Sequence, residues 1–459
     1  PIPAFTNADG EILMTERSVL AVAEKIREKG SNLWFHAEAA ELLESYKPEK
    51  DPDAPKWAKE NWKPSALKKG KDIFDVWFES GVSWHSVIEK GEQGRADLYL
   101  EGSDQHRGWF QSSLLTSLGA TGKPPFRHIL THGFIVDALG KKMSKSGGNA
   151  LEVEKILEQY GADVCRWWVA SLNYSKDVKA DIKIIEAATD EYRTIRNTIR
   201  FLLNNLNDFD PEKDRVEVEG DEYFVNNIAL GELRKMIGRI EMSTTVSFDY
   251  KGMSRGILSF CDQFLSKHYI EAVRDRLYCE RPDRKERRKT QTVMYDVADA
   301  LIKLCAPILV HTAEEAYKSL PGKEKTESVH MTSFPEGGGK IVETNKEVKI
   351  MDEWSETVLP FKEKCLIQLE RAKEEGKPSN PLDAEIRANR GSYDTFFSKE
   401  LADLIGVSRV TFEDGDIDIS VTDLTDQPKC NRCWKRAETA KIRSDGGTLC
   451  DRCADAVGV

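Results

Sequence analysis

The sequence of 459 residues is longer than one hydrophobic core can organise, so we expect roughly two to four domains. Hydrophobic residues account for 40% and charged residues for 32%, and no apolar run approaches the roughly 18 residues of a membrane span, which excludes an integral membrane protein. The net charge of −11 excludes a protein that coats nucleic acid by bulk positive charge, and it leaves room for local basic faces.

The cysteines indicate the cellular compartment, and the first residue bears on whether the sequence is a fragment. Five of the nine cysteines have no neighbour at short spacing, and no secretory signal precedes them: Cys165, Cys261, Cys279, Cys305 and Cys365. We therefore expect a reducing, cytoplasmic compartment. Because the chain opens on Pro1, with neither an initiator Met nor a targeting segment, we expect a fragment of a longer protein.

The first third of the chain predicts mixed α and β structure. Residues 2–46 predict a short strand and then a helix near 18–29, and the proline-bearing residues 47–71 predict a linker or surface loop. Between residues 72 and 146, apolar runs alternate with a helical pattern, which indicates parallel α/β structure. We expect strands at 74–78, 97–100 and 126–136, and a helix at about 107–118.

The remainder predicts mostly helices. Long amphipathic stretches indicate a helical bundle, at residues 191–206, 224–244, 252–276 and 290–320. From about residue 333, a helix near 358–375 and β-like runs at 407–412 and 417–421 predict a small α+β unit.

A lysine-rich loop follows the last apolar strand. Residues 140–149 hold three lysines, two serines and three glycines. A flexible backbone and mobile ammonium groups suit the binding of a polyphosphate. The ammonium groups offset the negative charge on a departing pyrophosphate more strongly in the transition state than in the ground state. A solvated turn is the alternative for such loops in general.

A second polar segment, residues 99–110, runs from a strand into a helix. This places Glu101 and Asp104 in the crevice where open α/β sheets bind ligands. Helix capping by Ser103 or Asp104 is the alternative, and it is compatible with binding.

The tail carries two Cys-x-x-Cys pairs, which are Cys430 with Cys433 and Cys450 with Cys453. This spacing lets two tight turns present four thiolates to one structural zinc ion. Two disulfides are the alternative, disfavoured by the expected reducing compartment. The neighbouring Trp434 packs either on the metal site or on RNA.

Two basic stretches lie in the helical block. Tyr192, Arg193, Arg196 and Arg200 recur at helical spacing, and residues 281–289 contain six basic residues among nine. Either stretch suits phosphate contacts or is a solvated helix face.

Three of these motifs resemble one family. Residues 142–146, Lys-Met-Ser-Lys-Ser after the strand ending at 132–136, resemble the signature loop of class I aminoacyl-tRNA synthetases. Residues 99–110 and the cysteine tail are similar to isoleucyl-tRNA synthetases of the bacterial type. Residues 75–81 look like their preceding strand, with Glu79 where the family usually has Asp.

The resemblance implies site roles. Lys142 and Lys145 would stabilise the pyrophosphate. Glu101 would bind the adenylate ribose, and Asp104 and Gln105 would bind the polar end of the amino acid. Trp77, Gln105 and Trp109 would line the amino-acid pocket. The other expected ATP or adenylate contacts are Gly102, His132, Gly133, Met143, Ser144 and Ser146. Expected cofactors and partners are structural Zn²⁺, Mg²⁺ with ATP, isoleucine and tRNA(Ile), with no membrane and a monomeric full-length form.

The resemblance also implies an architecture: the C-terminal half of a Rossmann-type nucleotide-binding domain, a helical anticodon-binding bundle, and a small α+β tail with a zinc unit. We expect a connector from a missing editing insertion at 1–57, the second half of the catalytic domain at 58–150 and a stem-contact-like linker at 151–186. The bundle is expected at 187–332, the α+β junction at 333–424 and the zinc tail at 425–459.

Two family elements have no counterpart in the sequence. None of the eight histidines stands in the His-x-Gly-His context that class I synthetases pair with the lysine loop, so we expect this chain alone to be inactive. The inserted editing domain of the family is also missing, apart from the connector expected at 1–57, so we expect no proofreading. The rival interpretations are a valyl, leucyl or methionyl synthetase and a non-catalytic tRNA-binding protein made from synthetase parts.

Overall fold

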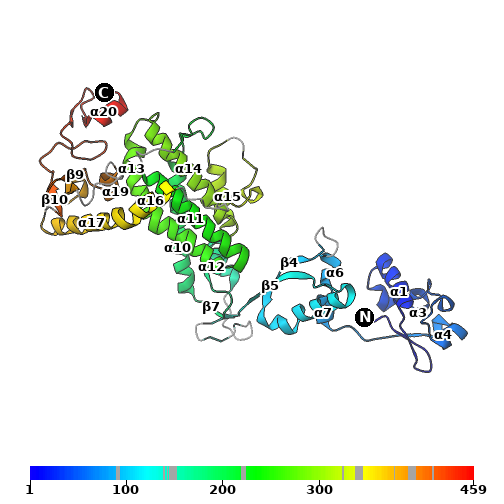
Figure 1. Cartoon of the computed structure of the whole chain (residues 1–459). Coiled ribbons are helices and arrows are strands. Elements are labelled where there is room, and N and C mark those ends of the chain that lie inside the picture. Colours follow the sequence, from blue (N-terminus) through cyan, green and yellow to red (C-terminus); the bar gives the residue numbers. More distant parts are fainter. Residues whose placement is uncertain are drawn as a thin grey trace. The chain divides into compact units, whose positions relative to one another are not determined.

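A computed structural model describes the chain except residues 89–93, 138–139, 142, 144–151, 219–223, 323–324, 336–344, 377, 391–399 and 416–417. It divides into two compact units (Figure 1). The N-terminal unit comprises Pro1–Phe134 with Tyr174–Asp177, and the C-terminal unit comprises Ile135–Asn173 with Val178–Val459. Among the described helices, none combines the length and the apolar character that crossing a bilayer requires.

The N-terminal unit begins with a three-stranded sheet of order β2-β1-β3, formed by β1 (Phe5–Thr6), β2 (Ile12–Leu13) and β3 (Lys68–Lys69). Helix α1 (Glu16–Lys29) starts at a capping box between Thr15 and Ser18. Short helices follow: α2 (Leu33–His36), α3 (Ala39–Leu42), η1 (Pro48–Lys50), α4 (Lys56–Glu60) and η2 (Pro64–Ala66).

The prediction of a linker at residues 47–71 is wrong. Asp51 is buried and accepts hydrogen bonds from the hydroxyls of Thr15 (2.6 Å) and Tyr46 (2.8 Å), and β3 pairs with β1. The expected domain boundary at residue 57 falls inside α4. Local composition concealed this structure because two of the partners, Thr15 and strand β1, lie at least 36 positions away in the sequence.

Two parallel strands form the next layer. β4 (Ala96–Gly102) pairs with β5 (Phe126–His132), and they are connected through η3 (Ser103–Arg107) and α7 (Trp109–Thr121). The strand expected at 74–78 is wrong, because α5 (Val76–Gly81) and α6 (Ser83–Val87) occupy this region. Asp75 caps α5 by accepting a 2.8 Å hydrogen bond from the backbone N–H of Trp77.

The C-terminal unit is dominated by a helical bundle (Figure 1). It opens with a parallel strand pair, β6 (Ile135–Val136) and β7 (Val178–Lys179). The helices are α8 (Val153–Tyr160), α9 (Ala162–Ser171), α10 (Ile182–Asn204), α11 (Phe224–Ser247), α12 (Tyr250–Ser259), the π-helix η5 (Phe260–Tyr269), α13 (Ile270–Cys279), α14 (Lys285–Cys305), α15 (Val310–Ser319) and η6 (Val329–Met331).

Two expectations for the bundle need correction. The linker boundary at residue 186 falls inside α10, and the single helix expected at 290–320 is two helices. The break contains Pro307, which has no backbone N–H to donate and cannot sit in a helix interior without strain.

The α+β part packs against the bundle in one continuous core. It contains α16 (Asn345–Glu353), the π-helix η7 (Trp354–Val358), α17 (Leu359–Glu374), η8 (Pro381–Asp383) and α19 (Leu401–Ile405). Its sheet has the order β10-β8-β9, with β8 (Ala384–Asn389), β9 (Arg409–Glu413) and β10 (Ile419–Asp423). The tail adds a hairpin of β11 (Lys441–Ile442) and β12 (Thr448–Leu449), then α20 (Asp451–Val457).

A buried lysine on α17 predicts a pH-dependent stability. The ammonium of Lys362 donates to the backbone carbonyl of Lys267 (3.0 Å) and to Nδ1 of His268 (3.2 Å), and burial lowers the pKa of Lys362 to about 8. The unfolded chain therefore binds more protons than the folded one between pH 8 and the ordinary lysine pKa of 10.5. Stability should rise across this window, by at most about 1.4 kcal/mol per pH unit.

Chemical denaturation at several pH values measures this slope. Lys362→Met should abolish the rise, whereas Lys373→Met, which removes an exposed lysine from the same helix, should keep it. An unchanged slope in the Lys362 variant would contradict the assignment.

Candidate functional site

The carboxyl ends of β4 and β5 bring the predicted adenylate residues together. Glu101 pairs in register with Thr131, and Gly102 with His132. A Cβ atom on Gly102 would lie 2.9 Å from Oδ1 of Asp104, and the rings of Phe134 and His132 would lie 3.6 Å and 3.7 Å away. A larger residue here would push the Asp104 carboxylate aside at the strand end where the polar groups of both strands meet.

The three predicted pocket residues cluster around Gly108. The backbone N–H of Trp109 donates to Oε1 of Gln105 at 3.1 Å, and a Cβ on Gly108 would lie 3.2 Å from the indole of Trp77. Trp109 is fixed twice: its indole N–H donates to the backbone carbonyl of Ser80 at 3.1 Å, and its ring stacks on Tyr99 at a centroid distance of 4.1 Å.

The two tryptophans differ in exposure. Trp77 is 43% exposed, whereas Trp109 is half-buried between Tyr99 and α5. Trp109 is thus a rigid support and Trp77 an open apolar surface, which suits a pocket wall. The close approach at Gly108 escaped the sequence analysis, because a glycine between Arg107 and Trp109 has no local signature.

The lysine loop lies mostly outside the described residues, and this includes Lys142, Ser144, Lys145 and Ser146. Its base is described. Oδ1 of Asp137 accepts from the backbone N–H of Lys141 at 2.9 Å, and Gly140 adopts a left-handed φ of 81°. Met143 is half-buried and packs against the helical core.

The four tail cysteines converge. Their Sγ atoms all lie within 4.8 Å of one another, and those of Cys433 and Cys450 are 4.0 Å apart. A tetrahedral zinc ion with Zn–S bonds of about 2.3 Å requires sulfur atoms about 3.8 Å apart, so the donor set fits this metal. All nine cysteines are free, which excludes the disulfide alternative in this structure.

Two local turns build the cluster. In the first, the backbone N–H of Trp434 donates to the carbonyl of Cys430 at 3.0 Å, and Trp434 has a left-handed φ of 63°. In the second, Cys450 precedes α20 and Cys453 lies in its first turn. Burial raises the pKa of Cys430, but hydrogen bonds from neighbouring backbone N–H groups outweigh it and lower that pKa to about 6.

Zinc content tests the cluster directly. We expect about one zinc ion per chain, and less than one in Cys450→Ser, because a structural site needs all four protein ligands. Cys165→Ser, at a half-buried cysteine of α9, is the control and should keep its metal. Metal analysis by mass spectrometry after desalting gives the answer, and a metal-free wild-type chain with an intact tail would refute the site.

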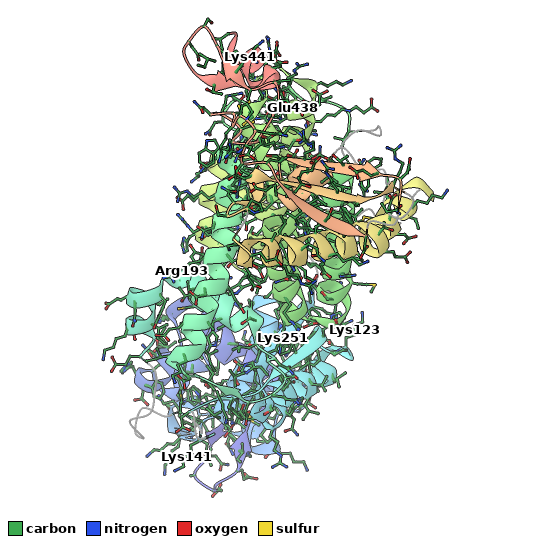
Figure 2. All side chains as sticks on the ribbon, turned by 90° about the vertical axis from the view of Figure 1, so that its left-hand side faces the viewer. Lys123, Lys141, Arg193, Lys251, Glu438 and Lys441 are labelled. Atoms are coloured by element: carbon green, nitrogen blue, oxygen red, sulfur yellow. The ribbon has the colours of Figure 1, made fainter. Side chains whose placement is uncertain are left out.

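A groove runs beside α10. Three hollows of about 700, 260 and 210 Å³ adjoin one another: the first and second share Tyr192 among their lining residues, and the second and third share Arg196. Arg193, Arg196 and Arg200 follow one another along this groove, and Figure 2 shows Arg193 at the surface. Arg196 and Arg200 form no ion pair within the part of the chain that the structure describes, so both guanidinium groups remain available to phosphates.

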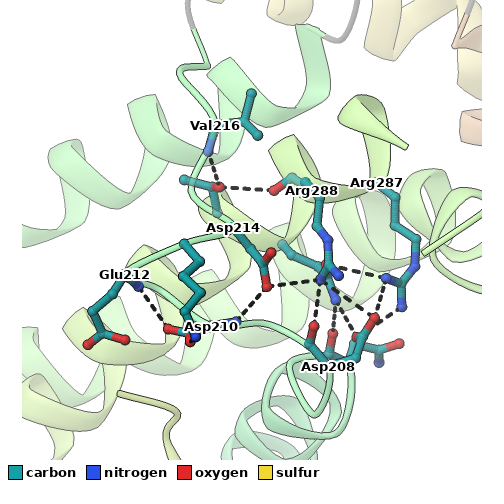
Figure 3. A network of polar contacts seen from close by, with 11 residues as sticks. Asp208, Asp210, Glu212, Asp214, Val216, Arg287 and Arg288 are labelled. Atoms are coloured by element: carbon teal, nitrogen blue, oxygen red, sulfur yellow. Dashed lines mark hydrogen bonds and ion pairs between the residues drawn. The ribbon is translucent and has the colours of Figure 1, made fainter. Parts of the chain in front are cut away.

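Two arginines of the second basic stretch, Arg287 and Arg288, have a structural role. Arg287 donates to both carboxylate oxygens of Asp208 (2.6 and 3.1 Å), and Arg288 lies 3.6 Å from a carboxylate oxygen of Asp214 (Figure 3). Both arginines are largely buried. These pairs fix the loop after α10 to α14, so a phosphate-binding role for Arg287 and Arg288 is not supported.

Comparison with known families agrees with this layout. Residues 1–181 match the family described as tRNA synthetases class I (I, L, M and V). Residues 226–376 match the anticodon-binding domain of tRNA ligase, and residues 427–456 match the zinc finger found in FPG and IleRS. The chain belongs to the class I tRNA synthetases. The predicted family and fold class are confirmed, and the zinc unit of the tail is that of a known family.

The curated relatives that match the chain are isoleucine–tRNA ligases. The chain is 37% identical to isoleucine–tRNA ligase 1 of Oceanobacillus iheyensis, over 100% of the chain and 49% of that protein. It is also 37% identical to the isoleucine–tRNA ligase of Carboxydothermus hydrogenoformans, over 99% of the chain and 49% of that protein. The chain therefore spans about half the length of the curated relatives it matches.

A solved structure supports the fold. The LeuRS of Agrobacterium radiobacter K84, solved in a ternary complex with tRNA and LeuAMS, superposes with a TM-score of 0.50 at 16% identity, covering 61% of this chain and 34% of that one. This likeness concerns the fold alone.

Proposed function

We propose that the chain supplies one half of an isoleucine–tRNA ligase. The whole enzyme joins isoleucine to the α-phosphate of ATP, releases pyrophosphate, and transfers the acyl group to tRNA(Ile). The observation that carries the proposal is the 37% identity to isoleucine–tRNA ligases along the full length of the chain. We place this activity in the cytoplasm, in a monomeric full-length enzyme.

The strand ends of the N-terminal unit supply the adenylate contacts in this proposal. The carboxylate of Glu101 is exposed beside Thr131, where it can accept hydrogen bonds from ribose hydroxyls. Asp104 accepts from the amino group of isoleucine, and the wall of Trp77 covers its branched side chain. Lys142 and Lys145 offset charge on the pyrophosphate, and Mg²⁺ arrives with ATP.

The C-terminal unit binds tRNA in this proposal. Phosphates of the RNA backbone meet Arg196 and Arg200 in the groove beside α10, and Trp434, which is 61% exposed beside the metal cluster, stacks on a base. The zinc ion has only protein ligands and is structural.

Amino-acid-dependent pyrophosphate exchange by the full-length parent enzyme tests the proposal. Isoleucine should support exchange best, and valine should support it at a rate roughly 100-fold lower. The two side chains differ by one methylene, and the isoleucine–valine pair is the known example of how little discrimination a pocket gains from one such group. Preference for valine, leucine or methionine would replace the assigned substrate. No exchange with any amino acid, together with retained tRNA binding, would favour a non-catalytic tRNA-binding protein.

A further inference from the structure

A lysine-rich surface lies on the N-terminal unit. Residues 47–71 hold eight lysines and four acidic residues, a net charge of +4, whereas the whole chain carries −11. Seven of the eight lysines are exposed. The eighth, Lys69, is half-buried and donates to the backbone carbonyls of Trp34 (2.6 Å) and Ala37. Most of the positive charge of this segment therefore faces solvent.

The backbone that carries these lysines is anchored. Helix η1 packs against α4, and the ammonium of Lys59 donates to the backbone carbonyl of Pro52 at 3.0 Å, which ties α4 to the loop between the two helices. Ala58 of α4 is fully buried, and Trp62 contacts the ring of Tyr46 edge-on at a centroid distance of 5.3 Å. The lysines of η1 and α4 thus project from a fixed base, which lowers the entropy cost of ordering them on a partner.

Five exposed lysines belong to η1 and α4 or flank them, and we call them the lysine face: Lys47, Lys50, Lys56, Lys59 and Lys63. Apart from the bond of Lys59 to Pro52, their ammonium groups form no ion pair or hydrogen bond with the residues that the structure describes. In contrast, both lysines of α1, Lys25 and Lys29, are paired with glutamates. Clustered cations without counter-charges suit a polyanionic partner.

The chemistry of the lysine face favours a phosphate backbone over a lipid surface. A basic face that binds membranes combines its cations with apolar side chains that enter the headgroup region. Residues 47–71, all of which the structure describes, include no exposed large hydrophobic side chain, because Trp57, Trp62 and Leu67 pack against the core of the unit. Ammonium groups contact phosphates and carry no information about base sequence. The face therefore fits the backbone of an RNA.

We propose that the lysine face binds the phosphate backbone of tRNA, at a site separate from the groove beside α10. The inference rests on the proposed role of the chain in tRNA binding, and it adds a sequence-independent contact on the N-terminal unit. Each phosphate that a lysine neutralises releases counterions, so this contact makes the affinity for tRNA fall as the salt concentration rises.

The salt dependence of tRNA(Ile) binding to the purified full chain tests the proposal. The triple variant Lys50→Gln, Lys56→Gln and Lys63→Gln should make the plot of log association constant against log salt concentration shallower by about 2 to 3. At about 0.1 M salt, the affinity should fall roughly 10- to 100-fold. A tRNA for another amino acid should lose affinity by the same factor, because backbone contacts read no bases.

Two controls separate this contact from general effects. Arginine at the same three positions keeps the charge and should keep the salt dependence of the wild type. Lys25→Gln with Lys29→Gln removes ammonium groups that are already paired with glutamates, and it should leave the salt dependence nearly unchanged.

Three outcomes would overturn the proposal. The first is a triple glutamine variant that is folded by circular dichroism and binds tRNA with the salt dependence of the wild type. The second is a loss of affinity confined to one tRNA. The third is lysine-dependent binding to phosphatidylserine vesicles without any such effect on tRNA, which would assign the face to a membrane surface. A full chain that binds no tRNA at all would overturn this inference together with the proposed tRNA-binding role, whereas the first outcome overturns this inference alone.

Discussion

Lys145→Ala in the full-length parent enzyme should reduce the rate of isoleucyl-adenylate formation by roughly 100- to 1000-fold and change the dissociation constant of ATP by less than 10-fold. Negative charge grows on the pyrophosphate as the bond to the α-phosphate breaks. An ammonium group on the loop therefore gains more interaction energy in the transition state than in the ground state. Single-turnover adenylate formation and equilibrium ATP binding measure the two quantities separately.

Lys141 provides a matched control on the same loop. Its side chain is exposed, and its backbone N–H is engaged by Asp137 at the base of the loop. Lys141→Ala should change adenylate formation by no more than a few-fold, because the turn needs only the backbone of this residue. If Lys145→Ala lost ATP binding and adenylate formation equally, Lys145 would be a ground-state ligand and the transition-state role would be wrong.

Features with a local cause could be predicted from the sequence. The two Cys-x-x-Cys pairs form their turns within a few residues, and the structure brings all four thiols together as expected. Helices α11 and α17 lie within a few residues of the predicted ranges, since each buries a periodic apolar face. The ends of β4 and β5 likewise follow from the rule that parallel strands share one carboxyl edge.

Features that depend on distant partners could not be predicted. Strand β8 was missed because it carries the charged Glu385 as its second residue, yet that carboxylate is buried and bound by Arg409 (2.9 Å) and Thr411 (2.6 Å) of β9. The arginines of α14 predicted a phosphate site, but Arg287 instead pairs with Asp208, which lies 79 residues earlier in the sequence. Hydrophobic periodicity predicts which face of a helix or strand is buried, but it does not predict which charged residue pairs with which.

A buried ion pair predicts the largest loss of stability. Arg276 of α13 and Glu400, which directly precedes α19, lie 2.7 Å apart, with side chains only 5% and 2% exposed. Glu400 also accepts from the backbone N–H of Val225, and Arg276 donates to the hydroxyl of Thr290. Glu400→Ala leaves the guanidinium buried without a counter-charge, so the free energy of unfolding of the C-terminal unit should fall by about 3–5 kcal/mol. Urea denaturation followed by circular dichroism measures the loss.

The comparison variants decide whether the unpaired charge or the lost hydrogen bonds cause the loss of stability. Glu370→Gln removes an exposed carboxylate paired with Lys373 on α17 and should change stability by less than about 0.5 kcal/mol. Arg276→Met combined with Glu400→Leu removes both charges and keeps the volume, so it should recover most of the stability that Glu400→Ala loses. If the double variant were as unstable as the single one, the hydrogen bonds to Val225 and Thr290, rather than the unpaired charge, would carry the effect. The stability of the junction between α13 and α19 would then depend on hydrogen bonds to its buried polar groups.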